Sequence, residues 1–201
     1  MIPTPIKKVI EVFSKFPTIG ERTATRFTLY LLSLTEEKVQ EICDSILSLK
    51  KEIKLCSLCF NPFTSKKDEE LCPICRDKKR NKALLCIIEK ETDLWQMEKM
   101  GAYSGLYFVL GGKMDFLKEN SLGKLRIEEF KKRVEESKPK EIILAINPTS
   151  EGVLTMNYLT RILKPYETKI TRLGRGLPTG GEIEYADDET IKKALEGREQ
   201  K

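Results

Sequence analysis

Four of the six cysteines form two Cys-x-x-Cys pairs, Cys56 with Cys59 and Cys72 with Cys75, and twelve residues separate the pairs. Each pair can bring two thiolates to one side of a metal ion, and zinc prefers four such ligands at tetrahedral corners. The segment between the pairs is polar and rich in turn-forming residues, so it has little apolar surface with which to fold alone. The spacing therefore predicts a structural zinc site whose four positions are all filled by protein.

Two other uses of these cysteines have to be weighed. Disulfides need an oxidising compartment, but the amino-terminal sequence lacks the basic segment and uninterrupted apolar run of a secretory signal. A redox-active Cys-x-x-Cys is expected as one pair in a thioredoxin-like setting. We therefore expect reduced cysteines in a cytoplasmic protein with no membrane span. The remaining two, Cys43 and Cys86, lie in apolar runs and are expected as small core residues.

The chain contains no histidine, which excludes Ser-His and Cys-His catalysis within it and any zinc site with a histidine ligand. Its net charge is +5, from 36 basic and 31 acidic residues. A weakly basic balance suits a nucleic-acid partner, but it is also typical of an ordinary solvated surface. The positions of individual charges are therefore more informative than their total.

Two arginines, Arg22 and Arg26, stand at the start of a predicted helix. Apolar residues recur with helical spacing over residues 5–16, a proline and a glycine then interrupt the pattern, and a second helix begins near Glu21. In such a helical hairpin, backbone N–H groups around Ile19–Arg22 would suit a phosphate, and the two arginines would share one helix face. Contacts of this kind bind DNA regardless of its sequence. An ordinary hairpin with two solvated arginines fits the spacing equally well.

Residues 35–53 predict a third helix with a single apolar stripe. We expect this stripe to pack against the hairpin and complete a small helical bundle. Its members are Val39, Ile42, Cys43, Ile46, Leu49 and Ile53.

From residue 83 onward, buried strands alternate with amphipathic helices. Strands are predicted at 83–89, 105–112, 141–146 and 168–174. This alternation indicates an α/β domain with a largely parallel sheet and right-handed crossovers.

Ligands of parallel sheets bind at the carboxyl ends of the strands. Glu89 ends the first predicted strand, and Glu151 lies in the NPTSEG segment that follows the third. These carboxylates could hold Mg²⁺ for phosphoryl chemistry, or they could be a polar strand terminus and the start of a helix. Two acids are few for magnesium-dependent strand cleavage.

The last segment combines a glycine-rich loop with a short helix that Asp187 or Asp188 would cap. The loop lacks the Gly-Lys-Ser/Thr ending of a phosphate-binding loop. It is expected to position the last helix or a partner chain.

The order of these segments resembles the RecR family of bacterial recombination mediators over nearly the whole chain. The stretches that carry the resemblance are FPTIGERTATR, CSLC, CPIC, AINPTSEG and GRGLPTGGEIEYAD. The resemblance implies an α/β fold, multi-domain α+β overall. Its expected parts are a helix-hairpin-helix bundle (1–54), a C4 zinc finger (55–80), a Toprim-like parallel-sheet domain (81–175) and a carboxyl-terminal loop and helix (176–201).

The related Toprim enzymes, topoisomerases and primases, carry an acidic residue that is matched here by Glu89, and the DxDxEG pattern of the topoisomerases begins at Asn147. Both aspartates of that pattern are replaced, by Asn147 and Thr149, whose uncharged side chains hold Mg²⁺ poorly. The resemblance therefore implies a degenerate or partner-binding site at Glu89, Asn147, Thr149 and Glu151, in a protein that is not an enzyme. The alternative is an active Mg²⁺-dependent nuclease or topoisomerase that uses Glu89 and Glu151.

The resemblance also implies a function. Family members bind single-stranded, double-stranded or gapped DNA without sequence preference, through hairpin positions matched here by Arg22 and Arg26. They form ring-like oligomers, so a homodimer or homotetramer is expected, and with RecO and RecF they load RecA at single-stranded gaps during recombinational repair. The family often has glycine in the hairpin turn where this chain has Thr18. A protein-interaction adaptor that never touches DNA is a further alternative.

Overall fold

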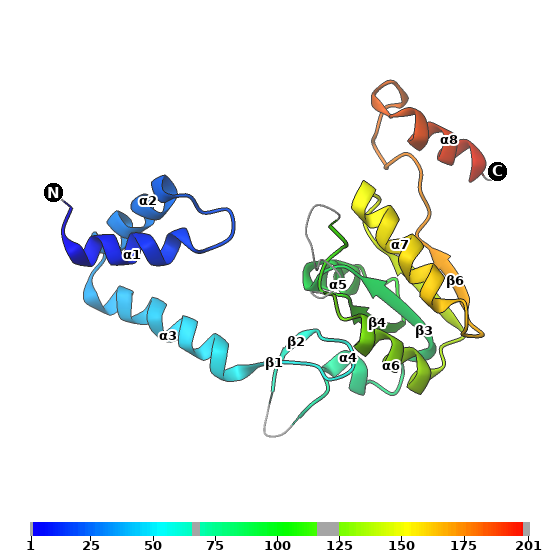
Figure 1. Ribbon diagram of the computed structural model, residues 1–201, viewed down its shortest axis with the longest axis horizontal. Coiled ribbons are helices and arrows are strands. Elements are labelled where there is room, and N and C mark those ends of the chain that lie inside the picture. Colours follow the sequence, from blue (N-terminus) through cyan, green and yellow to red (C-terminus); the bar gives the residue numbers. More distant parts are fainter. Residues whose placement is uncertain (1, 66–68, 116–124, 199–201) are drawn as a thin grey trace. The chain divides into compact units, whose positions relative to one another are not determined.

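The computed structural model describes residues 2–65, 69–115 and 125–198. The chain forms two compact units, residues 1–53 and residues 54–201, and Figure 1 shows their elements in chain order. None of the helices in the described ranges has the length and apolar character needed to cross a membrane.

The first unit is built on a pair of helices, α1 (Thr4–Ser14) and α2 (Glu21–Leu32). Ala24 is fully buried between them, and its small side chain lets the two backbones approach closely. The ring of Phe13 meets that of Phe27 edge-on, with centroids 6.0 Å apart. The predicted helix-hairpin-helix arrangement is present.

The third helix, α3 (Glu36–Glu52), has no buried residue. The prediction that its apolar stripe belongs to the core of the bundle was therefore wrong for the single chain, and Cys43 is exposed. The unit offers only two short helices as partners, and these pack on each other, while α3 extends beyond them (Figure 1). Several large apolar side chains of α3 consequently face solvent, among them Ile46, Leu47 and Leu49.

The second unit contains a four-stranded sheet in which all neighbouring strands are parallel, in the order β4-β3-β5-β6. Its strands are β3 (Asn81–Ile88), β4 (Gly105–Val109), β5 (Glu141–Ala145) and β6 (Lys169–Arg172). In the central register, Cys86 of β3 lies between Tyr107 of β4 and Ile143 of β5. The four predicted strands and their parallel pairing are confirmed.

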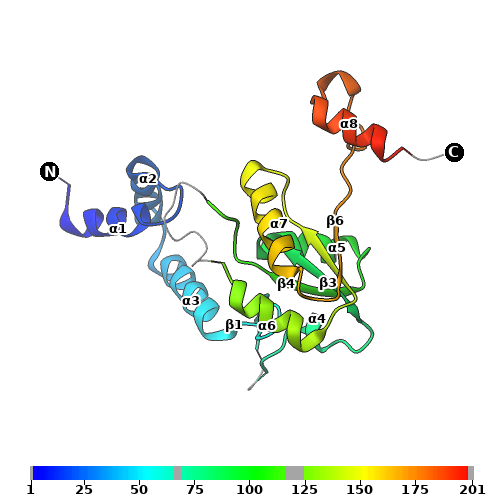
Figure 2. The same ribbon diagram turned by 45° about the vertical axis from the view of Figure 1, so that its right-hand side comes forward.

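Helices cover both faces of this sheet. Side chains of successive strand residues point to opposite faces, so neighbouring residues of β3 contact different helices. Leu85 and Ile87 face α6 (Ile127–Ser137) and α7 (Ser150–Leu163), whereas Cys86 and Ile88 face α5 (Glu91–Met100). Figure 2 shows these layers from a second direction. Cys86 is fully buried, as predicted for a core cysteine.

Two smaller segments complete the unit. The cysteine-rich segment holds β1 (Ile53–Leu55), β2 (Pro62–Thr64) and the short helix α4 (Pro73–Arg76). The carboxyl-terminal segment ends in α8 (Asp188–Glu196), and Asp187 caps this helix by accepting the N–H of Thr190 over 2.9 Å. The predicted carboxyl-terminal helix and its cap are therefore confirmed.

Candidate functional site

The four cysteine sulfurs, of Cys56, Cys59, Cys72 and Cys75, lie within 4.8 Å of one another. The sulfurs of Cys59 and Cys72 are 3.5 Å apart, and all four cysteines are free of disulfides. A tetrahedral zinc ion with bonds of about 2.3 Å requires sulfurs about 3.8 Å apart. The cluster thus has the composition and the spacing of a four-cysteine metal site.

Local hydrogen bonds create this geometry. Phe60 N–H donates to the carbonyl oxygen of Cys56 over 2.9 Å, and Cys56 N–H donates to that of Asn61 over 3.0 Å, which closes the first Cys-x-x-Cys turn. The turn requires a left-handed backbone at Phe60, where φ is +62°. In the second pair, Arg76 N–H donates to the carbonyl oxygen of Cys72 over 3.1 Å. Both turns point their sulfurs toward one centre.

Collecting four sulfurs in a buried space disfavours negative charge on all of them at once. The pKa of Cys59 is raised well above its ordinary value by hydrogen bonds with Cys56 and Cys72, and further by burial. A divalent cation at the centre reverses this preference, because it stabilises thiolates and releases their protons. The donor set therefore fits zinc, and these four residues would hold it.

The cysteine cluster is attached to the sheet through its first turn. Val109 N–H of β4 donates to the carbonyl oxygen of Cys59 over 2.9 Å. The ring of Phe60 packs edge-on against Phe108, with centroids 5.5 Å apart, and the guanidinium of Arg126 lies 4.7 Å from the centre of the Phe60 ring. Sequence reasoning missed Phe60 and Arg126, whose positions depend on contacts between distant segments.

At the carboxyl ends of the strands, Glu89 directly follows β3 and is only 2% exposed. Its Oε1 accepts the backbone N–H of Asn147 over 2.8 Å, so this carboxylate joins the ends of β3 and β5. Nearby, Gly152 packs against the carbonyl oxygen of Asn147, which would lie 1.9 Å from an added Cβ. The backbone here has no room for any residue larger than glycine.

The other two residues of the predicted strand-end site begin α7. Thr149 caps the helix, and its Oγ1 accepts Gly152 N–H over 3.2 Å. The ammonium of Lys113, which sequence reasoning missed, donates to Thr149 Oγ1 over 3.0 Å and to Glu151 Oε2 over 3.2 Å. The pKa of Glu151 lies below its ordinary value, first because of hydrogen bonding to backbone N–H at the helix start and then because of Lys113.

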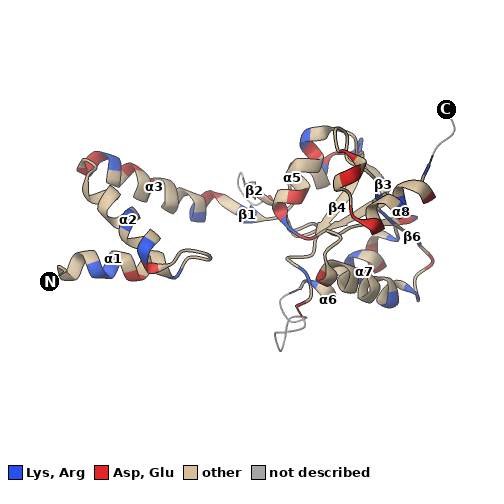
Figure 3. Ribbon diagram, turned by 90° about the horizontal axis from the view of Figure 1, so that it is seen from above, with Lys and Arg blue, Asp and Glu red and all other residues tan. Residues whose placement is uncertain are grey.

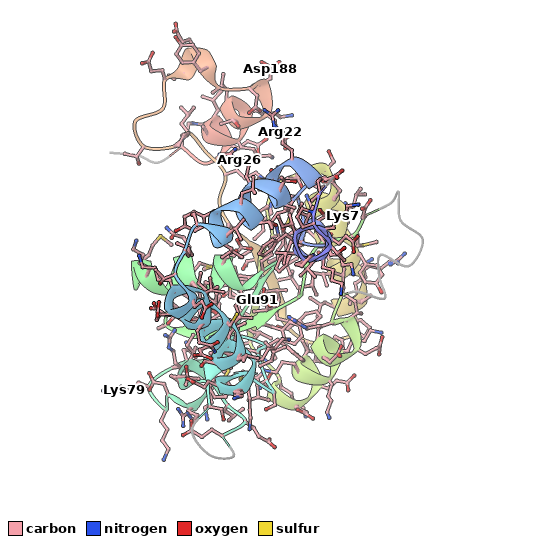
Figure 4. All side chains as sticks on the ribbon, turned by 90° about the vertical axis from the view of Figure 1, so that its left-hand side faces the viewer. Lys7, Arg22, Arg26, Lys79, Glu91 and Asp188 are labelled. Carbon is pink, nitrogen blue, oxygen red and sulfur yellow. The ribbon has the colours of Figure 1, made fainter. Side chains whose placement is uncertain are left out.

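In the first unit, Arg22 and Arg26 are exposed and project from the same side of α2 (Figure 4). Within the described part of the chain, neither arginine forms an ion pair and no side chain caps the start of α2. Basic and acidic residues are interspersed on α1, α2 and α3 (Figure 3), so these two arginines stand out by position and not by total charge. A helix start without a side-chain cap, like that of α2, leaves its first backbone N–H groups free to bind an anion.

One detail of the predicted phosphate site was wrong. Ile19 N–H donates to the carbonyl oxygen of Phe16 over 3.2 Å and is used inside the hairpin turn. This turn is tight because Thr18 has a left-handed backbone, with φ of +66°. The Ile19 amide is therefore not available to a phosphate, in contrast to the amides of the first helical turn, which begins at Glu21.

Three segments of the chain match family descriptions. Residues 6–49 match the RecR helix-hairpin-helix, residues 83–174 the Toprim domain, and residues 176–199 the RecR carboxyl-terminal region. The chain is 41% identical over 196 residues to proteins named "Recombination protein RecR" from two Clostridium perfringens strains, ATCC 13124 and 13. Each match covers 98% of this chain and 96% of the relative. The chain therefore belongs to the RecR family.

Proposed function

We propose that this protein is a recombination mediator that binds DNA without sequence preference and acts in recombinational repair. The observation that carries the proposal is the start of α2, where exposed Arg22 and Arg26 share one side of a helix whose first turn has no side-chain cap among the described residues. The name of its Clostridium relatives, "Recombination protein RecR", supports the same function.

The hairpin would contact the DNA backbone and leave the bases unread. The N–H groups of the first turn of α2 and the positive end of the helix dipole attract a phosphate oxygen. Arg22 and Arg26 then neutralise neighbouring phosphates on the same strand. Counterions released from the DNA make such binding strong at low salt and weak at high salt.

One hairpin makes few contacts, so useful affinity requires several copies. Large apolar side chains of the first unit remain exposed in the single chain, including Leu29, Tyr30, Leu32, Ile46 and Leu49. Residues of α2 and α3 also line a hollow of about 420 Å³. Exposed apolar surface of this extent favours self-association. We propose a homodimer or homotetramer that forms a ring-like clamp, in which hairpins on one DNA molecule add through effective concentration.

The cysteine cluster would hold a structural Zn²⁺ ion. When bound, the ion supplies the positive charge that keeps four thiolates together in a closed site. The residues of this chain do the remaining work. Cys59 and Phe60 attach the cluster to β4, and the indole N–H of Trp95 donates to Asn61 Oδ1 over 3.0 Å.

The Toprim domain would serve as a binding surface and not as a catalyst. Asn147 and Thr149 stand where the related enzymes have aspartates, and Thr149 and Glu151 are engaged by Lys113. By the family resemblance, the partners are RecO and RecF in the cytoplasm, at the nucleoid, and the outcome is RecA loading at single-stranded gaps. Glu89, Asn147, Thr149 and Glu151 form the degenerate Toprim site that we assign to partner binding, with the buried Glu89 holding the Asn147 amide in place.

Reconstituted loading tests this function. RecA assembly on gapped DNA, measured with RecO and RecF present, should be accelerated by the protein and not by the Arg22→Ala/Arg26→Ala variant. A control with the same loss of charge in the same unit is Lys50→Ala/Lys51→Ala at the end of α3, which should retain the activity. Equal activity of all three proteins would contradict the role of the hairpin. Nicking of supercoiled DNA that disappears in Glu89→Gln would instead identify an active Toprim enzyme.

A further inference from the structure

Lys113 is held at the strand-end site by the backbone that surrounds it. Gly111 and Gly112, just before it, have φ values of +91° and +144°, which side chains other than glycine rarely adopt. Just after it, Met114 N–H donates to Thr155 Oγ1 over 2.9 Å. The Thr155 side chain is fully buried in α7 and donates to the carbonyl oxygen of Glu151 over 2.7 Å. The chain after β4 is therefore tied to the first turns of α7 on the carboxyl side of Lys113.

The ammonium group of Lys113 lies between two oxygen atoms at the start of α7. It lies 3.0 Å from Thr149 Oγ1 and 3.2 Å from Glu151 Oε2. These are two of the oxygen-bearing positions of the segment NPTSEG, which begins α7 at the carboxyl end of β5. A hard divalent cation would compete for these oxygen atoms, above all for the carboxylate of Glu151, because carboxylate oxygens are its preferred protein ligands.

We propose that the ammonium group of Lys113 occupies the cation position of the strand-end site and prevents divalent metal ions from binding there. A positive charge within about 4 Å of a divalent ion repels it strongly, even near a protein surface. The lysine also uses the hydroxyl and the carboxylate as hydrogen-bond acceptors, so a metal ion would have to displace it from both. This inference concerns the second unit alone and does not depend on DNA binding by the hairpin.

The alternative is that Lys113 and Glu151 form an ordinary surface ion pair that has no effect on metal binding. The Lys113 and Glu151 side chains are 35% and 44% exposed, and an exposed ion pair contributes little to stability. If Lys113 were only such a partner, its removal would leave metal affinity unchanged. The two roles of Lys113 therefore predict different affinities for metal ions but similar stabilities of the fold.

The test measures Mn²⁺ binding to the full-length, zinc-loaded protein by electron paramagnetic resonance of the free ion. Wild type and Lys113→Arg, which keeps a positive charge, should bind Mn²⁺ weakly and equally. Lys113→Met, which keeps the apolar stem, should bind Mn²⁺ at least about tenfold more tightly. Lys131→Met is the matched control, because it removes one positive charge from another lysine paired with a carboxylate, that of Glu128.

Two further results decide the assignment. The gained affinity should disappear when Glu151→Gln is added to Lys113→Met, since the carboxylate would then be absent. The proposal is overturned if Lys113→Met binds Mn²⁺ no better than wild type, or if Lys131→Met gains as much affinity. It is also overturned if wild type already binds Mn²⁺ as tightly as Lys113→Met does.

Discussion

The backbone N–H of Val109 donates to the carbonyl oxygen of Cys59 over 2.9 Å, which joins the sheet to the cysteine cluster. Val109 ends β4, an edge strand of the four-stranded sheet. An edge strand presents N–H groups that need a partner, and here the first Cys-x-x-Cys turn supplies one. Phe60 reinforces the join by packing on Phe108. We therefore expect metal binding in the cysteine cluster to stabilise this edge of the sheet.

Removal of zinc should loosen the edge of β4. After chelation, hydrogen exchange of the Val109 amide should accelerate by at least about tenfold, because its acceptor belongs to a turn that the metal holds together. Leu110 is the internal control, since its N–H donates to the carbonyl oxygen of Ile88 inside the sheet. Unchanged exchange at Val109 after complete zinc removal would show that the turn persists without metal.

Thr18→Gly should stabilise the hairpin of the first unit. Thr18 has φ of +66°, and a β-branched residue pays about 1 kcal/mol or more for a left-handed backbone that glycine adopts freely. Slower hydrogen exchange of the α1 and α2 amides would measure the gain. The same substitution inside α2, Thr25→Gly, should instead cost about 0.5 kcal/mol. Faster exchange in Thr18→Gly would contradict the strained turn.

Gly152→Ala should disrupt the start of α7. A Cβ at this position would lie 1.9 Å from the backbone carbonyl oxygen of Asn147, so the strand end and the helix must separate. We expect a loss of about 3 kcal/mol in the free energy of unfolding, measured in urea by the fluorescence of the single tryptophan, Trp95. Gly176→Ala is the control, because an added Cβ there meets no atom within 4 Å. Similar stability of the two variants would refute this packing.

Glu151 should make the stability of the second unit depend on pH. The folded-state pKa of Glu151 is lowered, first by backbone hydrogen bonding and then by Lys113. The ionised side chain therefore stabilises the folded state at pH values above the unfolded-state pKa. That contribution is lost as pH falls through the lowered folded-state pKa. The difference in unfolding free energy between wild type and Glu151→Gln should therefore shrink as pH falls from 7 toward 3. A difference that is constant or grows in acid would contradict the predicted sign.

Local patterns in the sequence were sufficient for much of the fold. Continuous apolar runs and their alternation with helical patterns located all four strands of the parallel sheet, and the cysteine spacing indicated the cluster that the structure forms. The cap of α8 was narrowed to Asp187 or Asp188 because capping depends on neighbouring residues, and the structure shows that it is Asp187. The division into four domains and the roles of Arg22 and Arg26 stay predictions.

Features that depend on contacts between distant segments could not be predicted from local sequence patterns. The stripe of α3 has the same pattern as a core helix, but a local pattern does not show whether other residues cover it, and no residue of α3 is buried. Lys113 lies far from NPTSEG in the chain, and only the parallel sheet brings the two segments to one edge. Glu89 was recognised as a strand end, whereas its bond to the amide of Asn147 depends on the pairing of β3 with β5.

The central claim is that the start of α2 binds the phosphate backbone. It is tested most directly by fluorescence anisotropy of a labelled gapped duplex, titrated with protein at several salt concentrations. Wild type and the Lys50→Ala/Lys51→Ala control should bind with the same steep dependence on salt. Arg22→Ala/Arg26→Ala should bind more weakly, with a slope of log affinity against log salt that is shallower by about one unit for each arginine engaged. Equal affinity and slope for the arginine variant and wild type would place the DNA-binding surface elsewhere.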